Sequence, residues 1–83
     1  MTYGIIFSDS AVKQLTKLES GVQKRIISTL ERIKIRPQAH VTKLVGDLGY
    51  RLRVGDYRVI LDIDEGNLII LVITIGHRKK IYQ

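Results

Sequence analysis

The chain contains no cysteine, which excludes disulfide bonds, thiolate metal ligands and cysteine nucleophiles. It has few acidic residues, 8 Asp and Glu against 14 Lys and Arg, so the formal net charge is +6. A small domain this basic favours a polyanion or an acidic protein as its partner, although the charge also suits simple solubility. The carboxylates are not clustered as two-metal catalysis requires, and we expect neither a metal nor any other cofactor.

Long hydrophobic runs are also missing. The longest apolar segment, residues 68–75, is far shorter than the roughly 20 residues of a membrane-spanning helix. The N-terminus has neither the basic start nor the apolar core of a signal peptide. We therefore expect a cytoplasmic protein with no membrane partner. We also expect residues 1–83 to form one domain, and its 45% hydrophobic content suggests that some apolar surface meets a partner.

Two apolar stripes at helical spacing predict two amphipathic helices. Residues 8–10, Ser-Asp-Ser, offer N-caps for the first helix, because their side chains can accept hydrogen bonds from the free amides of a first turn. Residues 20–21, Ser-Gly, interrupt the pattern and predict a short glycine turn, so the two helices should form an antiparallel hairpin. The only proline, Pro37, is expected to end the second helix. The apolar positions are Ala11, Leu15 and Leu18 in the first stripe and Val22, Ile26, Ile27, Leu30 and Ile33 in the second.

The remaining apolar segments predict β-strands, at residues 3–8, 50–54, 57–63 and 68–75. Residues 37–49 predict a loop in which residues 43–45 can be extended. The last strand is apolar on both faces, which indicates a central place with helices over one face and partial cover over the other. The order β-α-α-β-β-β predicts an α+β fold, a small, mostly antiparallel, twisted sheet with the helical hairpin packed on one face.

A two-residue turn sets the pairing of the second and third strands. Residues 55–56, Gly-Asp, suit a tight hairpin turn because glycine comes first. In this register Arg53 lies opposite Arg58, and Arg51 lies opposite Ile60 on the same face. Three arginines are therefore expected on one face of the hairpin.

The two directly facing arginines require a compensating negative charge. Like charges opposite each other destabilise a sheet, and a small domain has little stability to spare. We therefore infer that an anion binds between them. The alternative is that Asp47, Asp56 or Asp62 neutralises the pair.

The same reasoning at the turn of residues 65–66 pairs Arg58 with Ile73 and brings the C-terminal tail beside the first turn. A β-bulge would move this register by one residue and exchange the faces. The side chains expected to gather at one end of the sheet are Arg53, Arg58, His77 and Arg78. The tail, residues 76–83, then combines proton-transfer groups with fixed positive charge. The alternative for the tail is a solvated run of like charge.

Such a cluster suits the binding of a phosphodiester. Arginine holds phosphate in a bidentate manner but cannot act as a base, whereas His77 and Tyr82 can transfer protons. RNA carries its own nucleophile, the 2′-hydroxyl. An enzyme that aligns this group with the phosphate and stabilises the developing charge needs no metal. The residues therefore favour RNA binding and cleavage.

Several motifs together resemble the RelE-like branch of the RelE/ParE toxin superfamily, and the resemblance covers essentially the whole chain. The motifs are Lys43-Leu44 followed by Gly46, Tyr50-Arg51-Leu52-Arg53, Gly55-Asp56-Tyr57-Arg58-Val59-Ile60, and Gly76-His77-Arg78-Lys79 followed by Tyr82. The ending has one residue fewer than the family pattern.

The resemblance implies a toxin of a type II toxin–antitoxin pair that acts as a ribosome-dependent mRNA endonuclease. Such toxins cleave codons in the ribosomal A site by 2′-hydroxyl attack on the adjacent phosphate, and so inhibit translation. The products are a 2′,3′-cyclic phosphate and a 5′-hydroxyl. The resemblance also implies a cognate RelB-like antitoxin, whose acidic amphipathic segment wraps the toxin and covers or distorts the basic site.

The resemblance assigns roles to individual residues. Arg58 and Arg78 look like the arginines that bind and stabilise the scissile phosphate, and Tyr82 looks like the tyrosine that orients or serves the nucleophile. Arg51 and Arg53 stand where relatives carry lysines, and an arginine cannot replace a general base. The expected catalytic residues are Arg58, Arg78, Tyr82 and His77, and the expected phosphate-binding residues are Arg51, Arg53, Lys79 and Lys80.

The general base stays open between His77 and Tyr82, unless activity rests on positioning and charge stabilisation alone. Two other functions compete with cleavage. ParE-like relatives share the fold but inhibit DNA gyrase by binding, and a relative without the lysines can bind RNA without cleaving it. The presence of both His77 and Tyr82 in the tail favours the nuclease branch.

Overall fold

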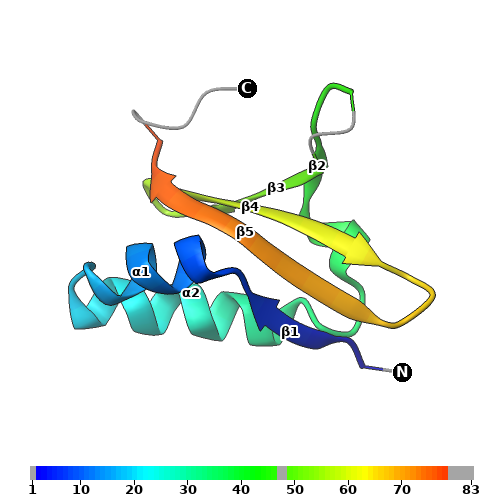
Figure 1. Ribbon diagram of the computed structural model, residues 1–83, viewed down its shortest axis with the longest axis horizontal. Helices are drawn as coiled ribbons and strands as arrows, with labels where there is room; N and C mark the ends of the chain where they lie inside the picture. Colours follow the sequence, from blue (N-terminus) through cyan, green and yellow to red (C-terminus); the bar gives the residue numbers. More distant parts are fainter. Residues whose placement is uncertain (1, 47–48, 79–83) are drawn as a thin grey trace.

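The elements follow the predicted β-α-α-β-β-β order along the chain (Figure 1). The computed structural model describes residues 2–46 and 49–78. Its elements are β1 Gly4–Phe7, α1 Asp9–Thr16, α2 Ser20–Arg32, the 3₁₀ helix η1 Pro37–His40, β2 Thr42–Lys43, β3 Tyr50–Val54, β4 Tyr57–Asp64 and β5 Ile69–His77. The predicted α+β fold is confirmed. The short strand β2 is an addition, within the segment predicted as a partly extended loop.

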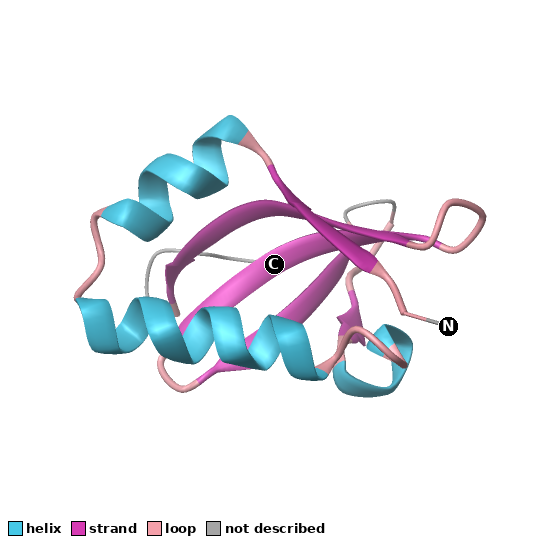
Figure 2. Ribbon diagram, turned by 90° about the horizontal axis from the view of Figure 1, so that it is seen from below, coloured by secondary structure: helices cyan, strands magenta, loops and turns pink. Residues whose placement is uncertain are grey.

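The strands form one five-stranded sheet in the order β1-β5-β4-β3-β2. The pair β1 and β5 is parallel, and the other three neighbouring pairs are antiparallel. Both α-helices lie over the same face of the twisted sheet (Figures 1 and 2). We call the opposite face the open face. β5 lies between β1 and β4, which agrees with the interior place expected for the most apolar strand.

The core lies between the helices and the sheet. Alternate residues of each strand point to opposite faces, and those that meet the helices are buried. The buried cluster contains Leu52, Val54, Val59, Leu61, Ile70, Val72 and Ile75 from the sheet and Ala11, Ile26, Leu30 and Ile33 from the helical hairpin. The prediction that Ile27 belongs to the buried stripe was wrong, since this residue is 38% exposed. Successive helix residues are turned by about 100°, so with Ile26 buried its neighbour lies outside the core.

The first helix begins as its capping pattern predicts, because the Ser8 Oγ accepts a hydrogen bond from a backbone N–H of the first turn at 3.0 Å. The predicted glycine turn was wrong. The helices are joined by residues 17–19, and Gly21 lies inside the first turn of α2. The connection closes without glycine, because the Gln23 side chain donates to the carbonyl of Leu18 at 2.8 Å.

Pro37 does not directly end α2, as the sequence pattern had predicted. The helix ends at Arg32, and Pro37 instead begins η1. Arg36 nevertheless has φ −142° and ψ 68°, outside the helical region, as expected for a residue that precedes proline. The proline therefore limits the path of the chain without marking the last helical residue.

The register of β4 against β5 differs from the prediction. Arg58 pairs with Gly76, whereas the sequence had predicted a pair with Ile73. The turn holds residues 65–68 rather than two residues, and it closes through Leu68 in the left-handed region, at φ 55°. This longer turn moves the register by two residues.

A β-bulge between Ile60 and Leu61 supplies one further residue of shift. The complete shift is three residues, and an odd shift exchanges the two faces of a strand. Gly76 and the position two residues after it therefore share the face of Arg58.

β1 ends at Phe7 while β5 continues to His77, so the last part of β5 has no neighbouring strand on the β1 side. Side chains form hydrogen bonds to its backbone there instead. The Ser8 hydroxyl donates to the carbonyl of Ile73 at 2.7 Å. The Gln14 Oε1 then accepts from the backbone N–H of Ile75 at 2.6 Å. These two residues of the helical layer hold the end of the strand that leads into the basic tail.

Candidate nucleic-acid interface

The β3–β4 hairpin has the register that its two-residue turn predicts. Arg53 pairs with Arg58, and Arg51 pairs with Ile60. Gly55 has φ +59°, a left-handed conformation that glycine adopts without steric cost. The three arginines alternate with residues buried under the helices, so they point to the open face.

Arg58 combines a buried nitrogen with several neighbouring positive charges. Its Nη1 is buried and has no hydrogen-bond partner among the described residues. Burial away from water, followed by the positive charges of Arg53, Arg51 and Arg78, lowers the pKa of the Arg58 guanidinium, and Asp56 opposes this shift. The protein thus holds a guanidinium with an unused donor among other positive charges. Arg58 is the side chain that an anion would satisfy.

The carboxylates do not neutralise the facing arginines within the described part of the chain. Asp56 lies 3.9 Å from the Nε of Arg78, and its carbonyl accepts from the Arg78 backbone N–H at 2.8 Å. Asp62 accepts from the adjacent backbone N–H of Ile63. None of the three hairpin arginines forms an ion pair with a described residue. Asp47, the third candidate, lies outside the described residues.

Arg78 joins the arginines of the hairpin, whereas His77 takes the opposite face. His77 pairs with Tyr57, and their rings form an edge-to-face contact with centroids 5.4 Å apart. Since Tyr57 packs against the core and precedes Arg58, His77 points to the helix side at the same end of the sheet. The expected gathering therefore holds for the three arginines 53, 58 and 78, and His77 lies across the sheet from them.

The other predicted residues of the tail, Lys79, Lys80 and Tyr82, lie outside the described residues. Two neighbours of the cluster were not predicted. Thr42 pairs with Arg51 across β2 and β3, and a strand of two residues gives too short a pattern to detect. Arg25 of α2 has its Nη1 2.8 Å from the position that a Cβ atom would take at Gly55, a contact that only the tertiary fold creates.

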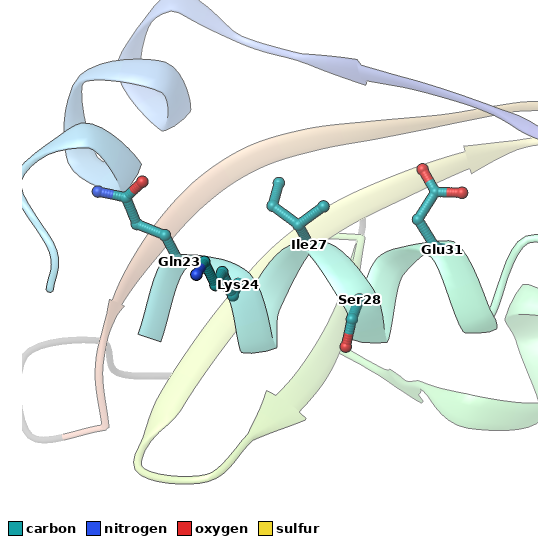
Figure 3. A pocket seen from close by; sticks show the side chains of 5 residues that line it. All are labelled: Gln23, Lys24, Ile27, Ser28 and Glu31. Carbon is teal, nitrogen blue, oxygen red and sulfur yellow. The ribbon is translucent and has the colours of Figure 1, made fainter. Parts of the chain in front are cut away.

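The arginine cluster is suited to hold a phosphodiester by several fixed charges at once. Among the described residues there is no group of three or more His, Cys, Asp or Glu side chains that could hold a metal. No helix in this part of the chain has the length and apolar character needed to cross a membrane. A shallow depression of about 430 Å³ lies instead on α2, lined by Gln23, Lys24, Ile27, Ser28 and Glu31 (Figure 3). None of the hairpin arginines lines this depression, so we do not assign the chemistry to it.

The chain is similar in sequence and fold to toxins of toxin–antitoxin systems. A family model described as the ParE toxin of type II toxin–antitoxin systems, parDE, matches residues 5–82. The mRNA interferase toxin RelE of Escherichia coli is 26% identical over 83 residues, which covers 96% of this chain and 87% of that protein. A chain of the RelBE2 toxin–antitoxin complex of Mycobacterium tuberculosis has a TM-score of 0.86 at 20% identity, over 94% of this chain and all (100%) of the other, a likeness of fold. A chain of the archaeal RelE–RelB complex of Pyrococcus horikoshii has a TM-score of 0.82 at 27% identity, over 98% and 100%.

Proposed function

The chain belongs to the ParE toxin family of type II toxin–antitoxin systems and is a RelE-like toxin, and from this premise we propose that it cleaves messenger RNA on the ribosome. The RNA in the A site is the substrate, and loss of the cleaved message stops translation. The similar protein of Escherichia coli is named an mRNA interferase, which supports this choice.

The observation that carries the proposal is the unpartnered, buried Nη1 of Arg58. A buried donor without a partner is costly, and a second arginine placed directly opposite adds repulsion. A scissile phosphate held by Arg58 and Arg78 gives the buried donor a partner, and its negative charge also screens the repulsion between Arg58 and Arg53. Charge on its oxygens rises as the reaction proceeds, so the same side chains would stabilise the transition state more than the ground state.

The reaction is an in-line transfer within the RNA. The 2′-oxygen attacks the adjacent phosphorus as its proton leaves, and the bond from phosphorus to the 5′-oxygen breaks. The products are a 2′,3′-cyclic phosphate and a 5′-hydroxyl, and the departing oxygen takes up a proton. Arg58 and Arg78 hold the phosphate, while Arg51, Arg53, Lys79 and Lys80 bind neighbouring phosphates.

Proton transfer is assigned to the tail. His77 and Tyr82 are the two candidates for the base, and arginine cannot serve. His77 points to the helix side of the sheet, in contact with Tyr57, while Arg58 points to the open face. This geometry favours Tyr82 as the residue that handles the nucleophile and gives His77 the task of fixing the start of the tail.

A cognate antitoxin is the second partner. The similar archaeal RelE was solved in complex with RelB. On the open face, Ile6 of β1 pairs with Leu71 of β5, and Ile73 follows on the bulge of β5. These three exposed apolar side chains lie on β1 and β5, and β5 is the neighbour of β4, the strand of Arg58. We assign this mixed surface to an acidic amphipathic segment of the antitoxin, which would bury the apolar residues and neutralise the arginines.

The test is primer extension on mRNA from a translating extract, with wild-type protein, Arg78→Ala and Lys13→Ala in parallel. Lys13 is an exposed cation of α1 and serves as the matched control. We expect ribosome-dependent cuts at codon positions that Lys13→Ala retains and that Arg78→Ala reduces by about 10²-fold or more. Tyr82→Phe and His77→Ala separate the proton-transfer roles, and the larger loss of kcat is expected for Tyr82→Phe. Cleavage by Arg78→Ala at the wild-type rate would refute the site assignment.

Gyrase inhibition is the competing function, because the matching family model is that of ParE toxins and Arg51 and Arg53 replace lysines. Intact mRNA together with inhibited DNA supercoiling would establish it. Intact mRNA with unaffected supercoiling and salt-sensitive RNA binding would identify a catalytically weak RNA-binding relative.

A further inference from the structure

The arginine cluster continues around the β3–β4 turn toward the helical layer. On the open face, the Nε of Arg53 donates to the carbonyl of Gly55 at 3.4 Å. From α2, the Nη1 of Arg25 lies 2.8 Å from the position of a Cβ at Gly55. The same glycine is thus approached by one guanidinium from β3 and by another from α2, so that positive charge is continuous across the turn.

The side of α2 that carries Arg25 also carries a second cation, Arg32, about two helical turns further on. Residues 25, 28 and 32 are spaced by three and four, so they are neighbours along one side of the helix. Arg25, Ser28 and Arg32 are all exposed. Figure 3 shows Ser28 pointing away from Ile27 and Glu31, on the side of α2 where the β3–β4 hairpin lies. We call these three residues the α2 row.

The composition of the α2 row indicates what it binds. It has two guanidinium groups, one hydroxyl and no apolar side chain. Within the described residues neither Arg25 nor Arg32 forms an ion pair, and the nearest acid along the helix, Glu31, binds Lys34 instead. The exposed apolar residue of α2, Ile27, lies on another side. Protein interfaces draw on apolar and aromatic residues at their centre, whereas a phosphate backbone is bound by cations and hydrogen-bond donors, among them hydroxyls, without apolar contacts.

We propose that the α2 row is a second RNA-binding surface, which grips backbone phosphates of the ribosome–mRNA complex beside the cleavage site. The inference rests on the proposed function and extends it from the scissile phosphate to the docking of the substrate. The row lies on the far side of the turn from the reacting phosphate. It therefore contributes to binding and not to the chemical step, and its loss affects KM and leaves kcat intact.

The test compares Arg25→Gln, Arg32→Gln and the double variant with Lys24→Gln. Glutamine removes the charge and retains helix propensity. Lys24 is the adjacent exposed cation of the same helix, and it lines the depression, as Ser28 does. Its side chain is turned by about 100° from that of Arg25, and its variant removes one positive charge, as each single arginine variant does. Binding of labelled protein to mRNA-programmed ribosomes is measured by sedimentation at several salt concentrations, and kcat and KM are measured on the same ribosomes. Circular dichroism confirms that each variant is folded.

For the double variant we expect about a tenfold weaker binding and a higher KM, with kcat unchanged, because two phosphate contacts are lost. The slope of log affinity against log salt concentration should also fall by roughly 0.7 to 0.9 for each lost contact. Lys24→Gln should show less than half of this change. A double variant that binds ribosomes with the affinity and salt slope of Lys24→Gln overturns the inference, whether or not the wild type cleaves. Wild-type protein that binds without cutting, together with weak binding of the double variant, supports the α2 row and refutes the nuclease. Wild-type protein that does not bind ribosomes refutes both.

Discussion

Gln14 offers the sharpest test of how the helical layer holds the strand that leads to Arg78. Its Oε1 accepts from the N–H of Ile75 at 2.6 Å and from the hydroxyl of Thr74 at 3.1 Å, and its Nε2 lies 2.9 Å from the same hydroxyl. Ile75 is 3% exposed, so in Gln14→Ala its N–H loses the partner in a place where water has little access. A buried donor left unpaired costs about 1–3 kcal/mol.

An expected loss of about 2 kcal/mol is large for this domain, because 83 residues typically provide only about 4–12 kcal/mol. Each 1 kcal/mol lowers Tm by about 4–8 °C in domains of this size, so Gln14→Ala should melt about 8–16 °C earlier. Urea unfolding monitored by circular dichroism measures the free energy, and hydrogen exchange at the Ile75 amide locates the effect. Gln14→Glu keeps the acceptor oxygens and should retain most of the stability.

The reasoning fails if Gln14→Ala unfolds within 0.5 kcal/mol of the wild type, about the limit for an ordinary surface substitution. It also fails if exchange at Ile75 is unchanged while the stability falls, because the loss would then arise elsewhere. Thr74→Val separates the contributions. This variant removes only the hydroxyl contacts and keeps the Ile75 hydrogen bond, so it should cost less than Gln14→Ala.

Two further predictions concern the open face. The lowered pKa of Arg58 means that the charged guanidinium is less favourable in the folded state than in the unfolded chain. Arginine titrates far above neutral pH, so this loss of folding stability is the same at every pH near neutrality. Sulfate should therefore raise the Tm of the wild type more than that of Arg58→Met, compared at equal ionic strength in chloride, and equal increments in the two proteins would argue against an anion site. The second concerns the antitoxin: Leu71→Lys should weaken binding of the cognate antitoxin by about tenfold in calorimetry, while Val12→Lys, an exposed apolar residue on α1, should not, and equal affinities would place the antitoxin elsewhere.

The hairpin of β3 and β4 could be predicted from sequence because its register depends on two residues. A turn with Gly55 first admits one tight pairing, and the left-handed φ of +59° is the conformation that this turn demands. The pair Arg53 and Arg58 followed directly from it. The helical hairpin was equally accessible, since its stripes of apolar residues repeat over several turns.

The register of β5 could not be obtained in the same way. The turn at residues 65–68 closes through Leu68 at φ 55°, and leucine carries no signal for a left-handed conformation. The bulge at Ile60 and Leu61 has no signature either, because both neighbouring strands remain apolar through it. Contacts such as that of Arg25 with the Gly55 turn depend on how α2 lies across the sheet, which no local pattern specifies.

The error in register changes the chemistry that the face can perform. In the predicted register His77 points to the face of Arg58 and Arg78 points away, and in the structure the two exchange places. The described open face thereby gains a guanidinium and loses an imidazole. At this end of the face, the arginine cluster can bind a phosphate and stabilise charge, but its guanidinium groups cannot remove a proton. If the protein cleaves RNA, the pH dependence of kcat should therefore follow a group of the tail. A profile that His77→Ala leaves unchanged and that Tyr82→Phe abolishes would agree with this arrangement. A profile that shifts with His77→Ala would require the imidazole to act from the helix side of the sheet.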